Sequence, residues 1–288
     1  MTGEDAFTYL QSQFSNDLKR NIERPSTYGL FLNRKGKVQA DAFVLRRGEE
    51  DFLVVSYFAE SAVLKEIVEA NLIADEVEME DVSQDYKLVT LWGDETLLTA
   101  YLPEAGTFRD LEDALVFRGR RMNAPHVEAL VSADECWPDD DAIDSGEGCD
   151  GIAALNSLNE ARIRDGVPAS PFDIGPDDLP QEAGDLATSA VSYTKGCYLG
   201  QEVMARLHAM GKAQRALYRV SFVDSAQSGT PIFAGEKQVG ELRSQVPVDG
   251  EKFLGLAMLK RRYVSPETEF CLGEPGGPSI KIEGETGA

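Results

Sequence analysis

The sequence changes character near residue 214, and this change limits the architectures that the chain can adopt. Before it, helical and β-rich patterns alternate along the chain. After it come only short β-rich runs between Gly, Pro and Asp turns, at residues 217–223, 231–233, 238–243, 253–259, 269–272 and 279–283. Short strands at this spacing are typical of a small antiparallel barrel or sandwich. We therefore expect a division into residues 1–213 and residues 214–288.

The first part begins with a helix, a hairpin, a strand and a second helix. Apolar residues recur at helical spacing in residues 6–21 and 60–72, whereas residues 27–32, 37–46 and 52–58 have β-rich patterns bounded by turns. This order indicates an antiparallel sheet covered by helices, which is an α+β fold.

The rest of the first part continues the mixture of strands and helices. We expect strands at residues 86–92, 114–118 and 127–131, and helices at residues 152–163 and 201–210. Residues 132–150 hold eight acidic residues and no basic one, which predicts a solvated loop. Residues 169–184 have no regular pattern and are rich in Pro, Gly and Asp. Because long irregular segments in compact proteins more often have a function than not, we expect one here.

The charge balance argues against a direct nucleic-acid binder, unless a local basic patch overrides the average. The net charge is −22, and its distribution is uneven: residues 214–288 hold 9 basic and 10 acidic residues, and the remainder holds 19 and 40. A field of this sign repels phosphates and favours solubility. No apolar run approaches the roughly 20 residues that span a bilayer. The acidic N-terminus also lacks the pattern of a signal peptide, so we expect a cytoplasmic protein and no membrane partner.

The cysteines and histidines are few and dispersed. The four cysteines form no C-x-x-C pair, and only His126 and His208 are present. A closed zinc site would need ligands from distant positions, so we expect no metal site. A disulfide framework is equally unexpected in a large cytosolic chain.

One cysteine has an unusual setting, in the segment KGCYLGQE at residues 195–202. Cys197 lies between Gly196 and Gly200, and Lys195 precedes it by two residues. In one interpretation Cys197 is an exposed thiolate favoured by the Lys195 charge, beside backbone N–H groups at a helix start that could bind an anion. In the other, the loop is a tight turn and Cys197 is a small buried hydrophobe. The residues alone leave both interpretations open.

Several ordered motifs resemble one family. Residues 195–202, followed by Arg206 and Gly211, are similar to the signature of the YgfZ family, folate-binding relatives of the glycine cleavage T-protein, an aminomethyltransferase. Further segments resemble the same family across most of the chain: YLQSQFSND at residues 9–17, KGKVQAD at 35–41, DGVP at 165–168 and LPQE at 179–182.

The resemblance implies a fold, a ligand and a role. The fold would be a ring of two α+β parts and a C-terminal antiparallel β-barrel around a central pocket for tetrahydrofolate or a derivative. The role would be the assembly or maintenance of iron–sulfur clusters, with iron–sulfur proteins or their assembly machinery as partners and tRNA-modifying enzymes supported indirectly. Cys197 and Lys195 would be the reactive pair. The implied cofactor-binding residues are Asp41, Arg164, Gln181, Glu182, Gly196, Tyr198, Gly200, Gln201, Glu202 and Arg206.

Two departures from the T-protein argue against its chemistry. The T-protein has an Asp-Asp pair where this chain has Ala40 and Asp41, and a pterin-recognising Glu where it has Arg164, with Asp165 beside it. A carboxylate accepts two parallel N–H bonds from a pterin, whereas a guanidinium only donates. A non-enzymatic accessory factor is therefore the first hypothesis. The alternatives are a tetrahydrofolate-dependent aminomethyltransferase-like enzyme and a protein-binding module whose acidic face docks basic partners.

Overall fold

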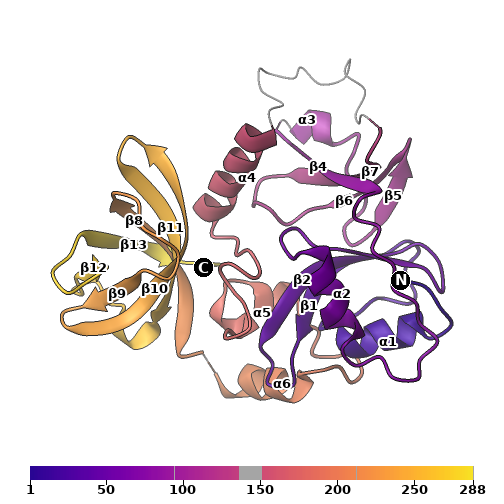
Figure 1. The fold of residues 1–288 in the computed structure, drawn as a ribbon, viewed down its shortest axis with the longest axis horizontal. Coiled ribbons are helices and arrows are strands. Elements are labelled where there is room, and N and C mark those ends of the chain that lie inside the picture. The colour runs from indigo at the N-terminus through magenta and orange to yellow at the C-terminus, as the bar shows by residue number, and fades with distance from the viewer. Residues whose placement is uncertain (94, 136–150, 212, 288) are drawn as a thin grey trace.

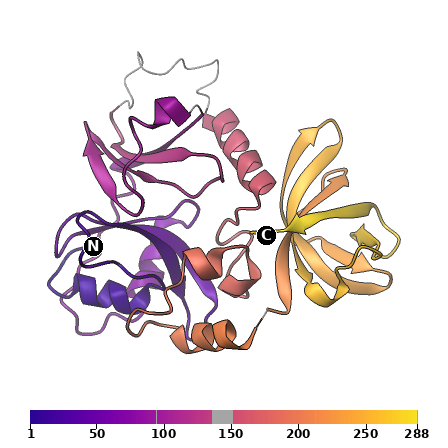
Figure 2. The ribbon, with the colours of Figure 1, turned by 180° about the vertical axis from the view of Figure 1, so that it is seen from behind.

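The computed structural model describes residues 1–93, 95–135, 151–211 and 213–287. Two helix-covered sheets and a barrel surround the C-terminal end of the chain (Figure 1, and from behind in Figure 2). The α+β class and the C-terminal antiparallel barrel are confirmed. Most of the acidic segment predicted as a loop, with Cys136 and Cys149, lies outside the described residues.

The first sheet has the order β1-β2-β3 and is antiparallel. The strands are β1 (Ser26–Leu32), β2 (Val38–Arg46) and β3 (Phe52–Val55), with helices α1 (Ala6–Gln13) and α2 (Ser61–Glu69) beside them. Helix α1 ends eight residues before the expected position, at Gln13 rather than near residue 21. The chain leaves the helix because Phe14 forms a β-bridge with Phe31 and the Ser15 N–H donates to the Leu30 carbonyl at 2.9 Å. Phe14 and Leu18 are still buried, although both lie outside the helix.

The second sheet has the order β4-β7-β6-β5. Its strands are β4 (Tyr86–Trp92), β5 (Phe108–Leu111), β6 (Ala114–Arg118) and β7 (His126–Ser132), and the short helix α3 (Glu95–Leu98) follows β4. Strand β5 was not expected from the sequence, because Arg109 and Asp110 interrupt its apolar pattern. The two sheets share one apolar core, in which Phe43 and Leu53 of the first pack with Phe117 and Leu130 of the second.

Helix α4 (Gly151–Asp165) carries the chain toward the barrel and contacts its strands β10 (Lys237–Asp249) and β11 (Lys252–Lys260) (Figure 1). An irregular stretch with the 3-10 helix η1 (Pro180–Glu182) and the short helix α5 (Leu186–Ser189) then returns to the first sheet. Helix α6 (Gln201–Met210) follows the KGCYLGQE segment within its predicted bounds.

The barrel is closed, with the strand order β10-β11-β8-β13-β12-β9. Its elements are β8 (Arg215–Val223), β9 (Pro231–Ala234), β10 (Lys237–Asp249), β11 (Lys252–Lys260), η2 (Arg261–Tyr263), β12 (Phe270–Leu272) and β13 (Ser279–Glu285). Strand β10 is longer than expected because it bends from β9 to β11, with register shifts on both sides. Gly240 lies at the bend, where a Cβ would come within 2.1 Å of the Met258 carbonyl oxygen.

A buried ion cluster fastens the barrel to the irregular stretch. The Asp178 carboxylate, 1% exposed, accepts from Arg215 at 3.0 Å and from Arg243 at 3.1 Å. Arg215 also pairs with Glu182 at 2.8 Å. Separating the barrel from the irregular stretch would leave the buried Asp178 carboxylate without a compensating charge, which costs free energy. The ion pairs therefore hold the barrel in place against the rest of the chain.

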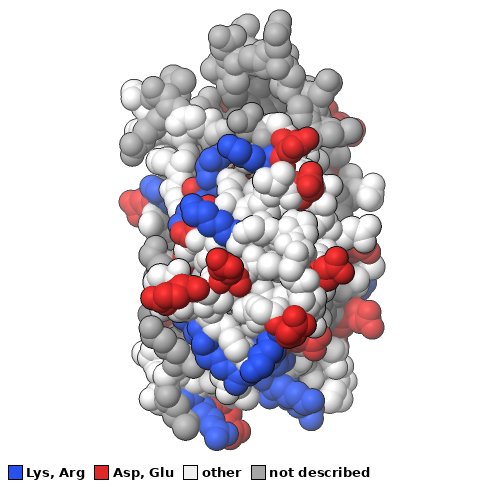
Figure 3. Space-filling model, turned by 90° about the vertical axis from the view of Figure 1, so that its left-hand side faces the viewer, with Lys and Arg blue, Asp and Glu red and all other residues white. Residues whose placement is uncertain are grey.

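The barrel end of the molecule is not dominated by acidic residues. On this face Lys and Arg side chains form separate groups with Asp and Glu between them (Figure 3), which agrees with the near balance of charge in residues 214–288. Among the described residues, no helix has the length and apolar character needed to cross a membrane.

Candidate functional site

A polar cavity of about 480 Å³ lies between the second sheet, the segment from the end of α4 to the start of α5, and the barrel. Its walls come from the segment after β6, from the end of α4, from the start of α5 and from the barrel. The charged side chains among the lining residues are Arg120, Asp165, Asp185, Arg219 and Glu285. Both signs of charge are therefore available to a ligand, and the volume is within the usual 300–1,000 Å³ of small-molecule sites.

Arg120 holds the walls of this cavity together. Its guanidinium donates to the Asp185 carboxylate, with Nη1 at 2.9 Å from Oδ2, and stacks on the Tyr28 ring with a centroid distance of 4.9 Å. Its backbone N–H donates to the Tyr57 hydroxyl at 3.0 Å. The first sheet, the second sheet and α5 are thus joined at one side chain.

Asp41 lies behind this contact rather than in the lining of the cavity. It is 4% exposed on β2, and its Oδ2 accepts from the Tyr28 hydroxyl at 2.8 Å. Its Oδ1 has no hydrogen-bond partner among the described residues. Burial raises the pKa of Asp41 to about 6, against the opposing effects of the Tyr28 hydrogen bond and the Arg120 charge. The carboxyl is therefore poised to exchange a proton near neutral pH.

The predicted ligand residue Arg164 points away from the cavity, and its neighbour Asp165 lines it. Arg164 is exposed and pairs with Glu160 at 2.6 Å. Asp165 accepts from the Asn123 N–H through Oδ2 at 2.7 Å. The end of α4 thus presents a carboxylate where the sequence comparison had placed a guanidinium.

The KGCYLGQE segment forms a surface loop that packs on the hairpin between β1 and β2. Gly200 has a left-handed φ of 86° at the start of α6, and a Cβ there would lie 2.9 Å from the Asn33 carbonyl oxygen. The Leu199 N–H donates to the Ser12 carbonyl at 2.9 Å. Gly200 is thus required by a close approach. Cys197 and Gly196 are exposed, which places the thiol in solvent rather than in the core.

Lys195 anchors this loop to the end of α1. Its ammonium, 9% exposed, donates to the carbonyls of Gln11, Phe14 and Asn16 at 2.7, 2.7 and 2.9 Å. Burial lowers the pKa of Lys195 to about 8, although the Asp17 charge opposes the change. An ammonium has three donors, so none remains to donate to Cys197.

The other predicted ligand residues lie around this loop and not at the cavity. Glu202 and Arg206 are exposed on α6, and Gln201 is half-buried at its first turn. Burial raises the pKa of Tyr198 to about 12, and its hydroxyl has no hydrogen-bond partner in the part of the chain that the structure describes. Gln181 donates to the Met204 sulfur at 3.4 Å, and Glu182 belongs to the ion cluster of the barrel.

Sequence reasoning missed four of the charged cavity residues. Arg120 and Asp185 belong to no recognised motif, and Arg219 and Glu285 lie on barrel strands more than fifty residues from α4. Only the fold brings them together. The neighbouring Asp165 was visible in the sequence, but without the helix geometry nothing showed that it faces inward.

We expect Asp41→Asn to change the pH dependence of stability. The folded-state pKa of about 6 is above the unfolded value near 3.9, so the folded protein binds this proton more tightly. The contribution of Asp41 to the free energy of unfolding therefore falls by about 2 kcal/mol as pH rises from 4 to 7, and Asp41→Asn removes that contribution.

Urea unfolding at pH 4 and pH 7 measures this difference. The variant should gain stability relative to the wild type between the two values, whereas Asp177→Asn, at an exposed position, should not. Burial also raises the pKa of Glu128 to about 7. Glu128 is present in the wild type and in both variants, so its contribution to the pH dependence cancels in the comparison. If the wild type and Asp41→Asn differ in free energy of unfolding by the same amount at both pH values, the buried position of Asp41 is contradicted.

Comparison with known proteins gives partial and full-length matches. Residues 1–109 match the family model for the GCVT N-terminal domain. The human iron-sulfur cluster assembly factor IBA57, mitochondrial, is 35% identical over 115 residues, which is 38% of this chain and 31% of that protein. The tRNA-modifying protein YgfZ of Colwellia psychrerythraea is 26% identical, over 84% of this chain and 74% of its own.

The fold matches a solved T-protein. The crystal structure of glycine cleavage system aminomethyltransferase T from Bartonella henselae superposes with a TM-score of 0.73 at 16% identity, covering 98% of this chain and 81% of that one. The chain spans only about half the length, or less, of the IBA57 proteins that it matches. Together these matches confirm the resemblance inferred from the motifs: the chain is a relative of the YgfZ and IBA57 proteins, built on the fold of the glycine cleavage T-protein.

Proposed function

We propose that this protein is a folate-binding accessory factor for the assembly or maintenance of iron–sulfur clusters. The polar cavity between the second sheet, the α4–α5 segment and the barrel carries the folate part of the proposal. The relatives named for iron–sulfur cluster assembly and tRNA modification support the rest. Iron–sulfur proteins or their assembly machinery are the proposed partners.

The residues at the cavity fit a reduced folate. The Asp165 carboxylate can accept the paired N–H groups of an aminopyrimidine ring, because carboxylates accept two parallel bonds. Arg219 donates to the carbonyl of Arg164 at 3.1 Å and is half-buried at the wall, where its remaining N–H groups can bind a carboxylate such as the glutamate tail. Asp41, behind Arg120, would act on the ligand through the Tyr28 and Arg120 contacts.

The exposed thiol of Cys197 is the proposed point of contact with the iron–sulfur partner. One cysteine cannot supply the four thiolates that usually hold a cluster. Among the described residues, no group of three or more His, Cys, Asp or Glu side chains could hold a metal. Neither cavity described in this structure is lined by residues of the Cys197 loop. The thiol and the folate cavity would therefore serve different steps of the same role.

Calorimetric titration with tetrahydrofolate under anaerobic conditions tests the ligand. The wild type should bind with a Kd well below 1 mM, and Asp165→Asn should weaken binding by about 10- to 100-fold through loss of a charge-assisted hydrogen bond. Arg164→Gln, on the exposed face of the same helix end, is the matched control and should bind like the wild type. Millimolar binding by the wild type, or equal loss in both variants, would contradict the assignment of Asp165.

Complementation of a strain that lacks its own YgfZ-type protein tests Cys197. Cys197→Ala should fail to restore the activity of an iron–sulfur enzyme, whereas Cys271→Ala, at a half-buried barrel position, should restore it. Because Cys197 is exposed, its replacement should change the free energy of unfolding by no more than about 0.5 kcal/mol. Full rescue by Cys197→Ala would exclude an essential thiol but would leave the folate titration unaffected.

A further inference from the structure

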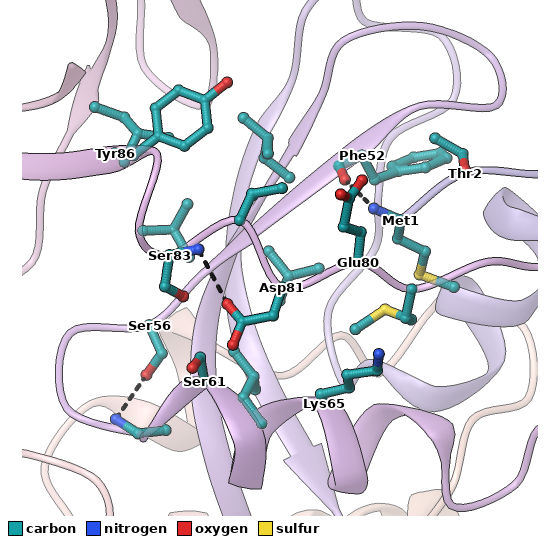
Figure 4. A pocket seen from close by; sticks show the side chains of 18 of the residues that line it. Met1, Thr2, Phe52, Ser56, Ser61, Lys65, Glu80, Asp81, Ser83 and Tyr86 are labelled. Carbon is teal, nitrogen blue, oxygen red and sulfur yellow. Dashed lines mark hydrogen bonds between the residues drawn. The ribbon is translucent and has the colours of Figure 1, made fainter. Parts of the chain in front are cut away.

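A second cavity, of about 500 Å³, lies beside the free edge of the first sheet, away from the polar cavity. The sheet ends at β3, so the outer edge of this strand has no neighbouring strand over residues 53–55 among the described residues. The facing wall is the segment 78–83, and the floor contains Leu64 of α2 and Leu88 of β4. We call this cavity the β3 groove (Figure 4).

The chain already uses one end of the β3 groove to add a short strand. Met1 and Phe52 exchange two backbone hydrogen bonds, each of 2.9 Å. Thr2 does the same with Glu78 on the opposite wall, at 2.9 and 2.8 Å. The two N-terminal residues therefore lie as a strand between both walls, antiparallel to each.

The groove continues beyond Met1 in the direction of this strand. Outward-facing backbone groups alternate along an antiparallel edge, so Val54 presents its N–H and carbonyl to the groove as Phe52 does. On the opposite wall, Glu80 follows Glu78 by the same two-residue step. Among the described residues, no hydrogen bond crosses the groove to either of these two backbones. The geometry of a strand site is thus present on both sides.

The charges along the groove select a basic occupant. Glu80 and Asp81 form no ion pair among the described residues. The three cations among the described residues that line the groove are already engaged: Arg47 with Asp51 at 2.7 Å, Lys65 with Glu69 at 3.8 Å, and the Met1 ammonium with the Phe52 carbonyl at 2.9 Å. Figure 4 shows Asp81 between Ser61 and Ser83, directed into the groove. Hydrogen bonds from these two serines lower the pKa of Asp81 to about 2, so it is ionised at neutral pH.

We propose that the β3 groove binds an extended, basic peptide segment of a partner protein, which adds as a strand between Val54 and Glu80. Backbone hydrogen bonds to the two walls would provide affinity, and a Lys or Arg facing Glu80 and Asp81 would provide selectivity. This mode of binding needs neither folate nor the Cys197 thiol, so it is independent of the proposed function.

Fluorescence anisotropy with a labelled synthetic peptide tests the proposal in 150 mM salt. The probe is acetyl-Val-Lys-Val-Lys-Val-amide, and its control is the same peptide with N-methylated backbone at the three central residues, which keeps the charge but removes the donors. The first should bind with a Kd below about 1 mM, and the second should bind at least about tenfold more weakly.

Three variants of the full chain locate the binding. Val54→Pro removes the outward N–H of an edge strand, a position where proline is tolerated, and should weaken binding at least about tenfold. Glu80→Gln should weaken it severalfold, and Glu236→Gln, an exposed acid on the barrel, should not. Equal binding of both peptides, or equal binding by Val54→Pro and the wild type, would reduce the effect to general attraction to an acidic protein and overturn the proposal.

A second measurement keeps the test decisive if Val54→Pro does not fold. In the wild type, the peptide should slow amide hydrogen exchange at Val54 and Glu80. Binding without protection at these two positions, or no binding below 1 mM, would likewise overturn the proposal.

Discussion

The contact of Arg120 with Tyr28, Tyr57 and Asp185 is the interaction on which the rest of the structure depends. It brings together the first sheet, the second sheet and the irregular stretch that leads back from α4, and the same guanidinium lines the polar cavity. A cavity with walls from separate parts of a chain exists only while those parts keep their relative positions. Arg120, with the ion cluster of Asp178 at the barrel, provides that constraint.

Most of the fold could be predicted from the sequence, because most elements have a local pattern of apolar and turn residues. Hydrophobic periodicity predicted both helices and all three strands of the first sheet, and the turn spacing predicted the barrel. Strand β5 was missed because charged residues interrupt its apolar pattern. Helix α1 and strand β10 differed because a distant contact decides each: α1 ends early where Phe14 meets Phe31, and β10 extends by bending at Gly240. Neither contact leaves a local signal.

The residues of the cavity could be predicted from the sequence only in part. The motif resemblance pointed to the end of α4, but it chose Arg164, and helix geometry turns Asp165 inward instead. The KGCYLGQE loop was identified by its glycines, yet Lys195 serves to tie the loop to α1, and Cys197 lies apart from the cavity residues. Residues such as Arg219 and Glu285 enter the cavity through tertiary structure alone. A motif therefore located two regions of interest without showing that they are separate in space.

The central claim is that the second sheet, the end of α4 and the barrel together form one folate cavity. Hydrogen–deuterium exchange measured by mass spectrometry, with and without tetrahydrofolate, tests it most directly. The account predicts that the ligand slows exchange in residues 119–123, 165–167 and 284–287 together, because walls from all three parts would close on it, and leaves residues 195–202 unchanged. Slowed exchange confined to one part, or found only in residues 195–202, would contradict it.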